Sequence, residues 1–165
     1  MGKPHVIRVV LLALCMGGWV LAQGANTTVD PKLAHDYAQL EAQAANRQGA
    51  KQAEALAKLA EMDFDFAHAG YLANQTTEGD QQLDRATQHA DQACAVLKTE
   101  AARGKTGGVR NVEISLQRVT YGLKDLAQRV HFRQRPKVEA VGSHFADLRA
   151  ELLDMMFAPK PSKGS

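Results

Sequence analysis

Two histidine and aspartate pairs are the side chains whose types and spacing could do chemistry. Asp65 and His68 lie one helical turn apart, and so do His144 and Asp147. If the two helices that carry them pack side by side, two imidazoles and two carboxylates meet, a donor set that suits zinc or another divalent ion. The other interpretation makes them polar residues at the edges of apolar faces, because this spacing is less diagnostic than His-Glu-x-x-His. The candidate metal ligands are Asp65, His68, His144 and Asp147.

Other catalytic and cofactor patterns are missing from the sequence. Covalent haem needs Cys-x-x-Cys-His, which does not occur, and Ser115, Ser143 and Cys94 lie in no nucleophile motif. Carboxylates such as Glu61 and Asp63 need a cleft before they can act as acid and base, and short-looped helices predict none. Three further histidines have no metal-binding company: His35, His89 and His131. We therefore expect no enzyme activity and no cofactor.

Positive charge is concentrated in the second half of the chain. Residues 23–97 have a net charge of −6 and residues 98–165 a net charge of +6. One interpretation is a surface for an anionic envelope component or an envelope protein. The preferred one places acidic helices beside basic helices, with ordinary solvated faces. The residues assigned to the first interpretation are Arg129, Arg133, Arg135 and Lys137.

The first 22 residues have the form of a cleavable secretion signal. Lys3 and Arg8 precede an apolar run over 9–22, which is shorter than the roughly 20 residues that a spanning helix needs. Val20 and Ala22 are small enough for the recognition sites of a signal peptidase. Cleavage after Ala22 predicts a periplasmic or secreted protein without a transmembrane anchor, and makes nucleic acid an unsuitable partner. An uncleaved anchor and a lipid-anchored cysteine are the alternatives.

Removal of the signal leaves one cysteine in the mature chain. Cys15 lies in the signal, so Cys94 has no intramolecular partner for a disulfide. Ala93 and Leu97 lie on the same apolar helix face as Cys94, which predicts that the thiol is buried and inert. Pairing with a second chain is the alternative.

Apolar residues spaced alternately by three and four predict an all-α fold. We expect a linker at 23–29, a helical bundle domain at 30–157 and a disordered tail at 158–165. The expected helices span 31–47, 50–74, 78–103, 108–133 and 136–157. Their apolar faces match level by level, which predicts an antiparallel up-down-up-down four-helix bundle with an additional N-terminal helix. A single helix through Gly49 is the alternative for the first two segments.

Two glycines in the expected helices, Gly122 and Gly142, predict close approach of neighbouring helices, because glycine costs about 1 kcal/mol relative to alanine in a helix.

The function that the sequence supports is an exported, non-enzymatic binding or scaffold protein. A bundle that binds a small ligand or a divalent metal is the second hypothesis. The pattern does not indicate an oligomeric state.

Overall fold

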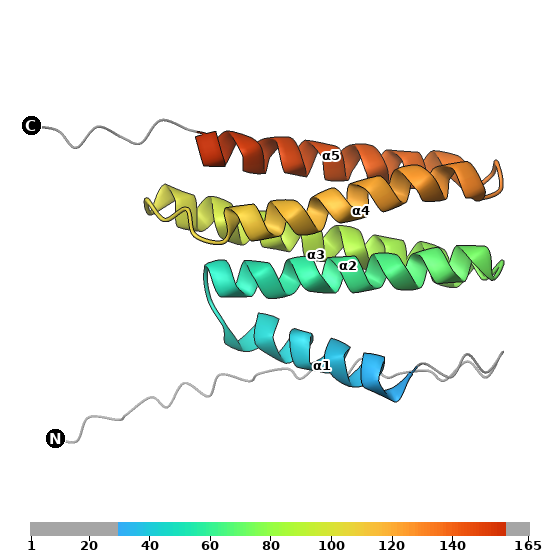
Figure 1. The fold of residues 1–165 in the computed structure, drawn as a ribbon, viewed down its shortest axis with the longest axis horizontal. Coiled ribbons are helices and arrows are strands. Elements are labelled where there is room, and N and C mark those ends of the chain that lie inside the picture. The colour runs from blue at the N-terminus through green and yellow to red at the C-terminus, as the bar shows by residue number, and fades with distance from the viewer. Residues whose placement is uncertain (1–29, 158–165) are drawn as a thin grey trace, which may run out of the picture.

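The computed structural model describes residues 30–157, and these residues form five helices without a strand (Figure 1). The helices are α1 (Pro31–Asn46), α2 (Ala50–Leu72), α3 (Thr76–Ala102), α4 (Val109–Arg129) and α5 (Arg135–Phe157). The all-α prediction is therefore confirmed for this part of the chain. The predicted signal at 1–22, most of the region before α1 and the predicted tail at 158–165 lie outside the described residues. Within 30–157, none of the helices combines the length and apolar character that a membrane span requires.

The helix boundaries follow local signals in the sequence. The Asp30 side chain caps α1 by accepting a hydrogen bond from the Lys32 backbone N–H at 2.9 Å, and Pro31 occupies the first turn. Gly49 adopts a positive φ of 61°, which ends the possibility of one continuous helix from α1 into α2. The fourth helix ends at Arg129, earlier than expected, because Val130 is extended.

Four of the helices, α2 to α5, enclose the core, and α1 packs on the outside of α2. Around the core, α2 contacts α3 and α4, while α5 also contacts α3 and α4. The pair α2 and α5 makes no contact, and α3 touches α4 only marginally. The predicted metal site needs the fifth helix beside the second, and the structure does not place these two helices together. Matching apolar levels did not reveal this, because a regular seam is in phase with a helix across the core as well as with one beside it.

Polar contacts between α2 and α4 show how this pair is aligned. Asn111 donates to Glu54 at 2.8 Å, and Arg118 donates to Glu61 at 3.3 Å. Both pairs are 57 residues apart, so residue numbers rise together along the two helices. The helices α2 and α4 are therefore parallel to each other.

The buried side chains are those of the predicted apolar faces. The largest fully buried ones are Phe145, Leu59, Leu83, Leu97, Leu116, Leu123, Leu126, Leu152, Val109, Val112, Val119 and Val138. Cys94 is buried as expected, and burial raises the pKa of its thiol to about 12.

The two glycines that were expected to permit close approach differ. A Cβ on Gly122 would lie 2.5 Å from ring carbons of Phe64, so close approach is confirmed there. A Cβ on Gly142 would lie 3.7 Å from the Cβ of Leu123, which is an ordinary contact. Of these two glycines, Gly122 has a packing reason to lack a side chain and Gly142 does not.

Candidate functional site

The four residues of the predicted metal site are not brought together. Asp65 and His68 are on α2, whereas His144 and Asp147 are on α5, and these two helices make no contact. The Nε2 atom of His144 instead lies 2.7 Å from a carboxylate oxygen of Asp91 on α3. Within residues 30–157, no three His, Cys, Asp or Glu side chains are grouped so that they could hold a metal ion. The site required the helix pairing that the structure contradicts.

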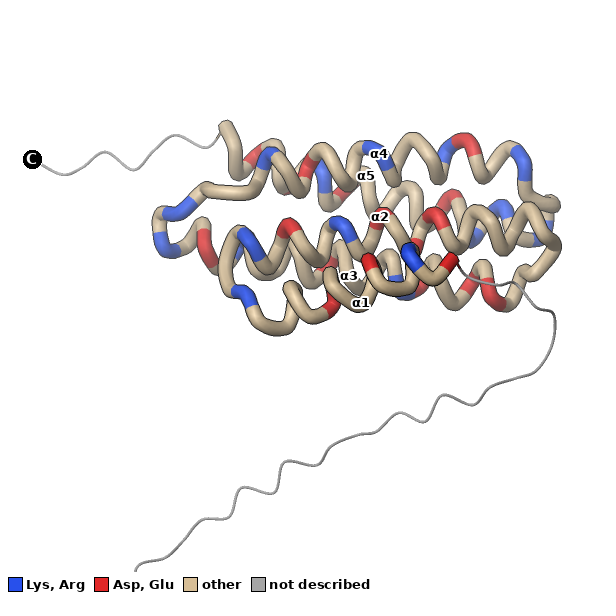
Figure 2. The backbone as a smooth tube through the Cα atoms, turned by 60° about the horizontal axis from the view of Figure 1, so that its bottom comes forward, with Lys and Arg blue, Asp and Glu red and all other residues tan. Residues whose placement is uncertain are grey.

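Two of the basic residues assigned to a partner surface are engaged within the bundle. The Nε atom of Arg129 lies 2.8 Å from Asp125, and the Nζ atom of Lys137 lies 3.0 Å from Asp84 on α3. Acidic and basic positions are interspersed along the helices in Figure 2. Arg118 and Lys137, from the basic half of the chain, pair with acids of the other half across the α2–α4 and α3–α5 contacts: Glu61, Asp80 and Asp84.

The other two basic residues, Arg133 and Arg135, are placed differently. Arg135 donates from Nε to the backbone carbonyl of Ala127 at 3.0 Å. The guanidinium of Arg133 lies 5.8 Å from the ring centroid of Phe132. Neither residue forms a salt bridge with a carboxylate among the described residues. Both lie at the end of the bundle where α4 joins α5.

A buried carboxylate on α2 is hydrogen-bonded to side chains of two other helices. Asp63 has no solvent exposure. Its Oδ1 atom accepts a hydrogen bond from the hydroxyl of Tyr37 on α1 at 2.8 Å, and its Oδ2 atom lies 2.7 Å from Nδ1 of His89 on α3. Three helices thus each contribute one residue, and we call Tyr37, Asp63 and His89 the Asp63 cluster.

The sequence places Asp63 there because α2 has two buried faces. One face, which includes Phe64, turns toward the four-helix core. The other includes Leu56 and Leu59 and turns toward α1 and α3, and Asp63 continues this second face at a spacing of three and four. A second apolar stripe on α2 interrupted by one aspartate was the signal that could have found the site. From the sequence, Asp63 was expected only as a possible catalytic carboxylate, and His89 had no metal-binding company.

The environment of the Asp63 cluster determines how its groups behave. Burial and the hydrogen bond to Asp63 raise the pKa of the Tyr37 hydroxyl above its ordinary value, so this hydroxyl remains a donor. A carboxylate removed from water costs free energy unless its oxygens are hydrogen-bonded, and both oxygens of Asp63 have partners. Because Nδ1 of His89 faces Asp63, the ring orientation is set and Nε2 is left for another group.

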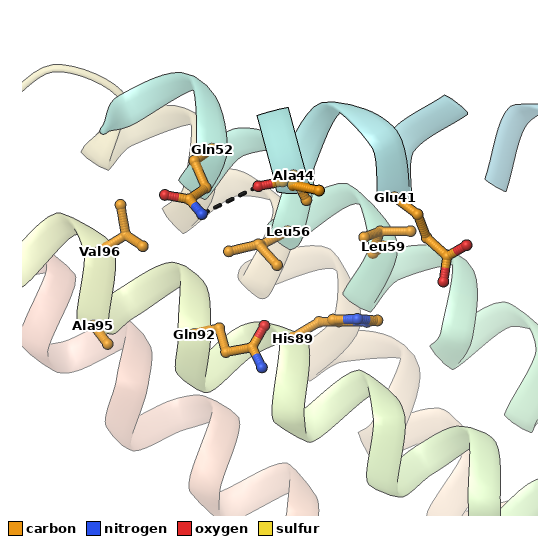
Figure 3. A pocket seen from close by; sticks show the side chains of 10 residues that line it. Glu41, Ala44, Gln52, Leu56, Leu59, His89, Gln92, Ala95 and Val96 are labelled. Atoms are coloured by element: carbon orange, nitrogen blue, oxygen red, sulfur yellow. Dashed lines mark hydrogen bonds between the residues drawn. The ribbon is translucent and has the colours of Figure 1, made fainter. Parts of the chain in front are cut away.

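His89 lies at the edge of a groove between α1, α2 and α3 (Figure 3). The groove has a volume of about 500 Å³, within the range of roughly 300–1,000 Å³ that is usual for small-molecule sites. Its lining residues are Glu41, Ala44, Ala45, Gln52, Leu56, Leu59, His89, Gln92, Ala95 and Val96. Gln52 donates to the backbone carbonyl of Ala44 at 3.1 Å, which joins α2 to the end of α1 beside the groove. The groove thus combines a mostly apolar surface with a few polar side chains, and it is open to solvent.

The ten lining residues carry six apolar side chains, two glutamines, one glutamate and one histidine. None of the ten is a serine, threonine, cysteine or lysine, and the carboxylate nearest His89 already uses both oxygens. Comparisons with protein family profiles, curated proteins and solved structures find no match to this chain.

Proposed function

We propose that this chain is an exported, non-enzymatic helical-bundle protein that binds a small organic ligand in the groove between α1, α2 and α3. The observation that supports the proposal is the His89 ring at the edge of an apolar groove, oriented by the fully buried Asp63. Burying a carboxylate costs free energy, and replacing a buried ion pair by apolar residues is often neutral or stabilising. Stability alone therefore does not account for Asp63 in this position. The ligand that fits has an apolar body for Leu56 and Leu59 and one hydrogen-bonding group for Nε2 of His89.

The export part of the proposal has a separate basis, the signal-like sequence at 1–22. It implies a periplasmic or secreted location, where an envelope protein or an anionic envelope component is an available partner. We include in the proposal an up-down-up-down course of the chain from α2 to α5, with α1 as the additional helix. Short connections between successive helices and the parallel register of α2 and α4 support this course.

A variant that fills the groove tests the binding site. Ala95 is exposed on α3 and lines the groove, so Ala95→Phe should occupy it without disturbing the core. Ala146→Phe is the matched control, because Ala146 is equally exposed on α5, which does not line the groove. A library of small aromatic amides and carboxylates is screened by saturation-transfer NMR. We expect compounds that bind the wild type and Ala146→Phe but not Ala95→Phe; no binders, or equal binding to both variants, would contradict the proposal.

The export part is tested by expressing the full chain in a Gram-negative host and fractionating the cells. The proposal predicts a periplasmic or secreted product that begins at Gln23, as measured by intact mass. A product that stays in the cytoplasm with its first 22 residues would refute export but leave the groove proposal unaffected.

A further inference from the structure

Two apolar side chains are exposed together at one end of the bundle. Leu72 is the last residue of α2 and is 52% exposed, and Phe132 lies between α4 and α5 and is 66% exposed. Because α2 and α4 align with an offset of 57 residues, Leu72 is level with Arg129, just before the connection that holds Phe132. Figure 1 shows the ends of α2 and α4 and the start of α5 at the same end. We call Leu72 together with residues 129–137 the bundle tip.

The bundle tip combines this apolar surface with positive charge. Residues 129–137 read Arg-Val-His-Phe-Arg-Gln-Arg-Pro-Lys, with four basic side chains and no carboxylate. The Arg133 guanidinium lies 5.8 Å from the centroid of the Phe132 ring, so a cation and an exposed aromatic ring form one unit. This pairing suits an interface that is anionic at its surface and apolar beneath.

Carboxylates at the same end of the bundle at least equal these four basic side chains in number. Asp125 pairs with Arg129, while Asp80 and Asp84 pair with Lys137. Glu78 in the first turn of α3 and Glu139, one turn after Arg135 on α5, are further exposed acids at the same end. The positive charge that the bundle tip offers is therefore local: among the described residues, Arg133 and Arg135 form no salt bridge, and both lie next to Phe132 in the sequence or one turn from it.

We infer that the bundle tip docks on the surface of an anionic phospholipid membrane, with Phe132 in the interfacial region and Arg133 and Arg135 among the phosphates. A protein partner normally covers about 800 Å² per side, which is more than two exposed apolar side chains on a narrow end provide. A bilayer interface needs no matching shape, accepts single aromatic side chains and attracts nearby arginines. The predicted export would place the protein beside such a membrane, and the groove proposal is not required.

A single tryptophan at the bundle tip gives a direct test. The one tryptophan of the sequence is Trp19, so the chain that starts at Gln23 has none. All five described helices and their contacts lie within 30–157, so this shorter chain retains them. Phe132→Trp places a fluorophore at the bundle tip. Phe157→Trp is the matched control, because Phe157 is 80% exposed at the opposite end of α5.

Each variant is titrated with vesicles of phosphatidylglycerol and phosphatidylcholine in equal parts, and with vesicles of phosphatidylcholine alone. The inference predicts a blue shift of the emission of Phe132→Trp with the anionic vesicles only, and none for Phe157→Trp. No shift, an equal shift for both variants, or an equal shift with both vesicle types would overturn it. A shift with polyglutamate but not with vesicles would also overturn it and would indicate an acidic protein partner.

The contribution of charge is measured in the Phe132→Trp background. Adding Arg133→Gln should lower the vesicle partition coefficient about fivefold, the factor expected for one cation near an anionic surface. Arg110→Gln is the control, because Arg110 is exposed at the start of α4, at the other end of the bundle. Far-UV circular dichroism verifies that both variants keep the helical fold. Equal partitioning of the two variants would overturn the role of Arg133.

Discussion

Substituting Tyr37 by phenylalanine removes one of the two hydrogen bonds to the buried Asp63 and keeps the ring. The Tyr37 hydroxyl donates to Oδ1 of Asp63 at 2.8 Å, and the ring also lies against Phe66, with centroids 6.1 Å apart. The variant therefore isolates the hydroxyl from the packing of α1 on α2. Asp63 itself retains only His89 as a partner.

The structure determines the expected size of the effect. A hydrogen bond to an ionised group contributes about 1.5–3 kcal/mol to stability, more than a neutral one. Asp63 has no exposure, so water does not readily replace the lost donor. We therefore expect Tyr37→Phe to lower the free energy of unfolding by about 2 kcal/mol. Tyr121→Phe is the matched control: Tyr121 is 63% exposed and donates no hydrogen bond within the described residues, so its change should stay within about 0.5 kcal/mol.

The assay is urea unfolding followed by circular dichroism, combined with hydrogen exchange of the α1 amides. Hydrogen exchange is needed because Ala44 is the only buried residue of α1, so part of the loss can appear as local opening of that helix. Faster exchange over 31–46 in Tyr37→Phe, with unchanged exchange in Tyr121→Phe, supports the reasoning. If Tyr37→Phe matches the wild type in both measurements, the Asp63 cluster does not hold α1 in place.

Alkaline pH tests the same hydrogen bond, because the stability that it provides should decrease as the Tyr37 hydroxyl loses its proton. The pKa of Tyr37 is raised in the folded protein by burial and by Asp63, so the folded state keeps this proton at a pH where the unfolded state loses it. The stability that it provides is complete below about pH 10 and declines as the pH rises further. The stability difference between the wild type and Tyr37→Phe should therefore shrink above about pH 10, by at most roughly 1.4 kcal/mol per pH unit. Tyr71, whose pKa is also raised by burial, is present in both proteins and does not affect the difference.

Three further substitutions or reactions test the packing. Gly122→Ala should lower stability by about 1 kcal/mol, because the clash of its Cβ with Phe64 at 2.5 Å outweighs the gain in helix propensity. Gly142→Ala should instead raise stability by about 1 kcal/mol, since its Cβ meets Leu123 only at 3.7 Å; denaturation curves compare the two, and the same sign for both would contradict the packing. Cys94 should react with Ellman's reagent no faster than the protein unfolds, because burial raises its pKa to about 12, and rapid labelling of the native protein would disprove this.

Much of the fold could be predicted from local patterns. The spacing of apolar residues identified five helices and the faces that they bury. The burial of Cys94 followed from its position on such a face. These features depend on neighbours within one or two helical turns, which the sequence displays directly.

The candidate site could not be predicted in the same way. Tyr37 and His89 each lie 26 residues from Asp63, and nothing in their own neighbourhoods indicates that they meet. The predicted metal ligands, by contrast, depended on α2 and α5 being neighbours, and the structure separates them. A polar site made from three helices requires knowledge of which helices touch.

Sequence alone thus determined the secondary structure, the apolar faces and the signal-like character of residues 1–22. Only the tertiary structure decided that α4 lies beside α2, that α5 lies beside α3, and that Asp63 joins α1 to α3. The physical reason is that a seam with a regular spacing of three and four specifies the height and the inward face of each residue. Such a seam can pack against any of the other helices, so the choice of neighbouring helix depends on side-chain volumes and polar contacts across the whole bundle.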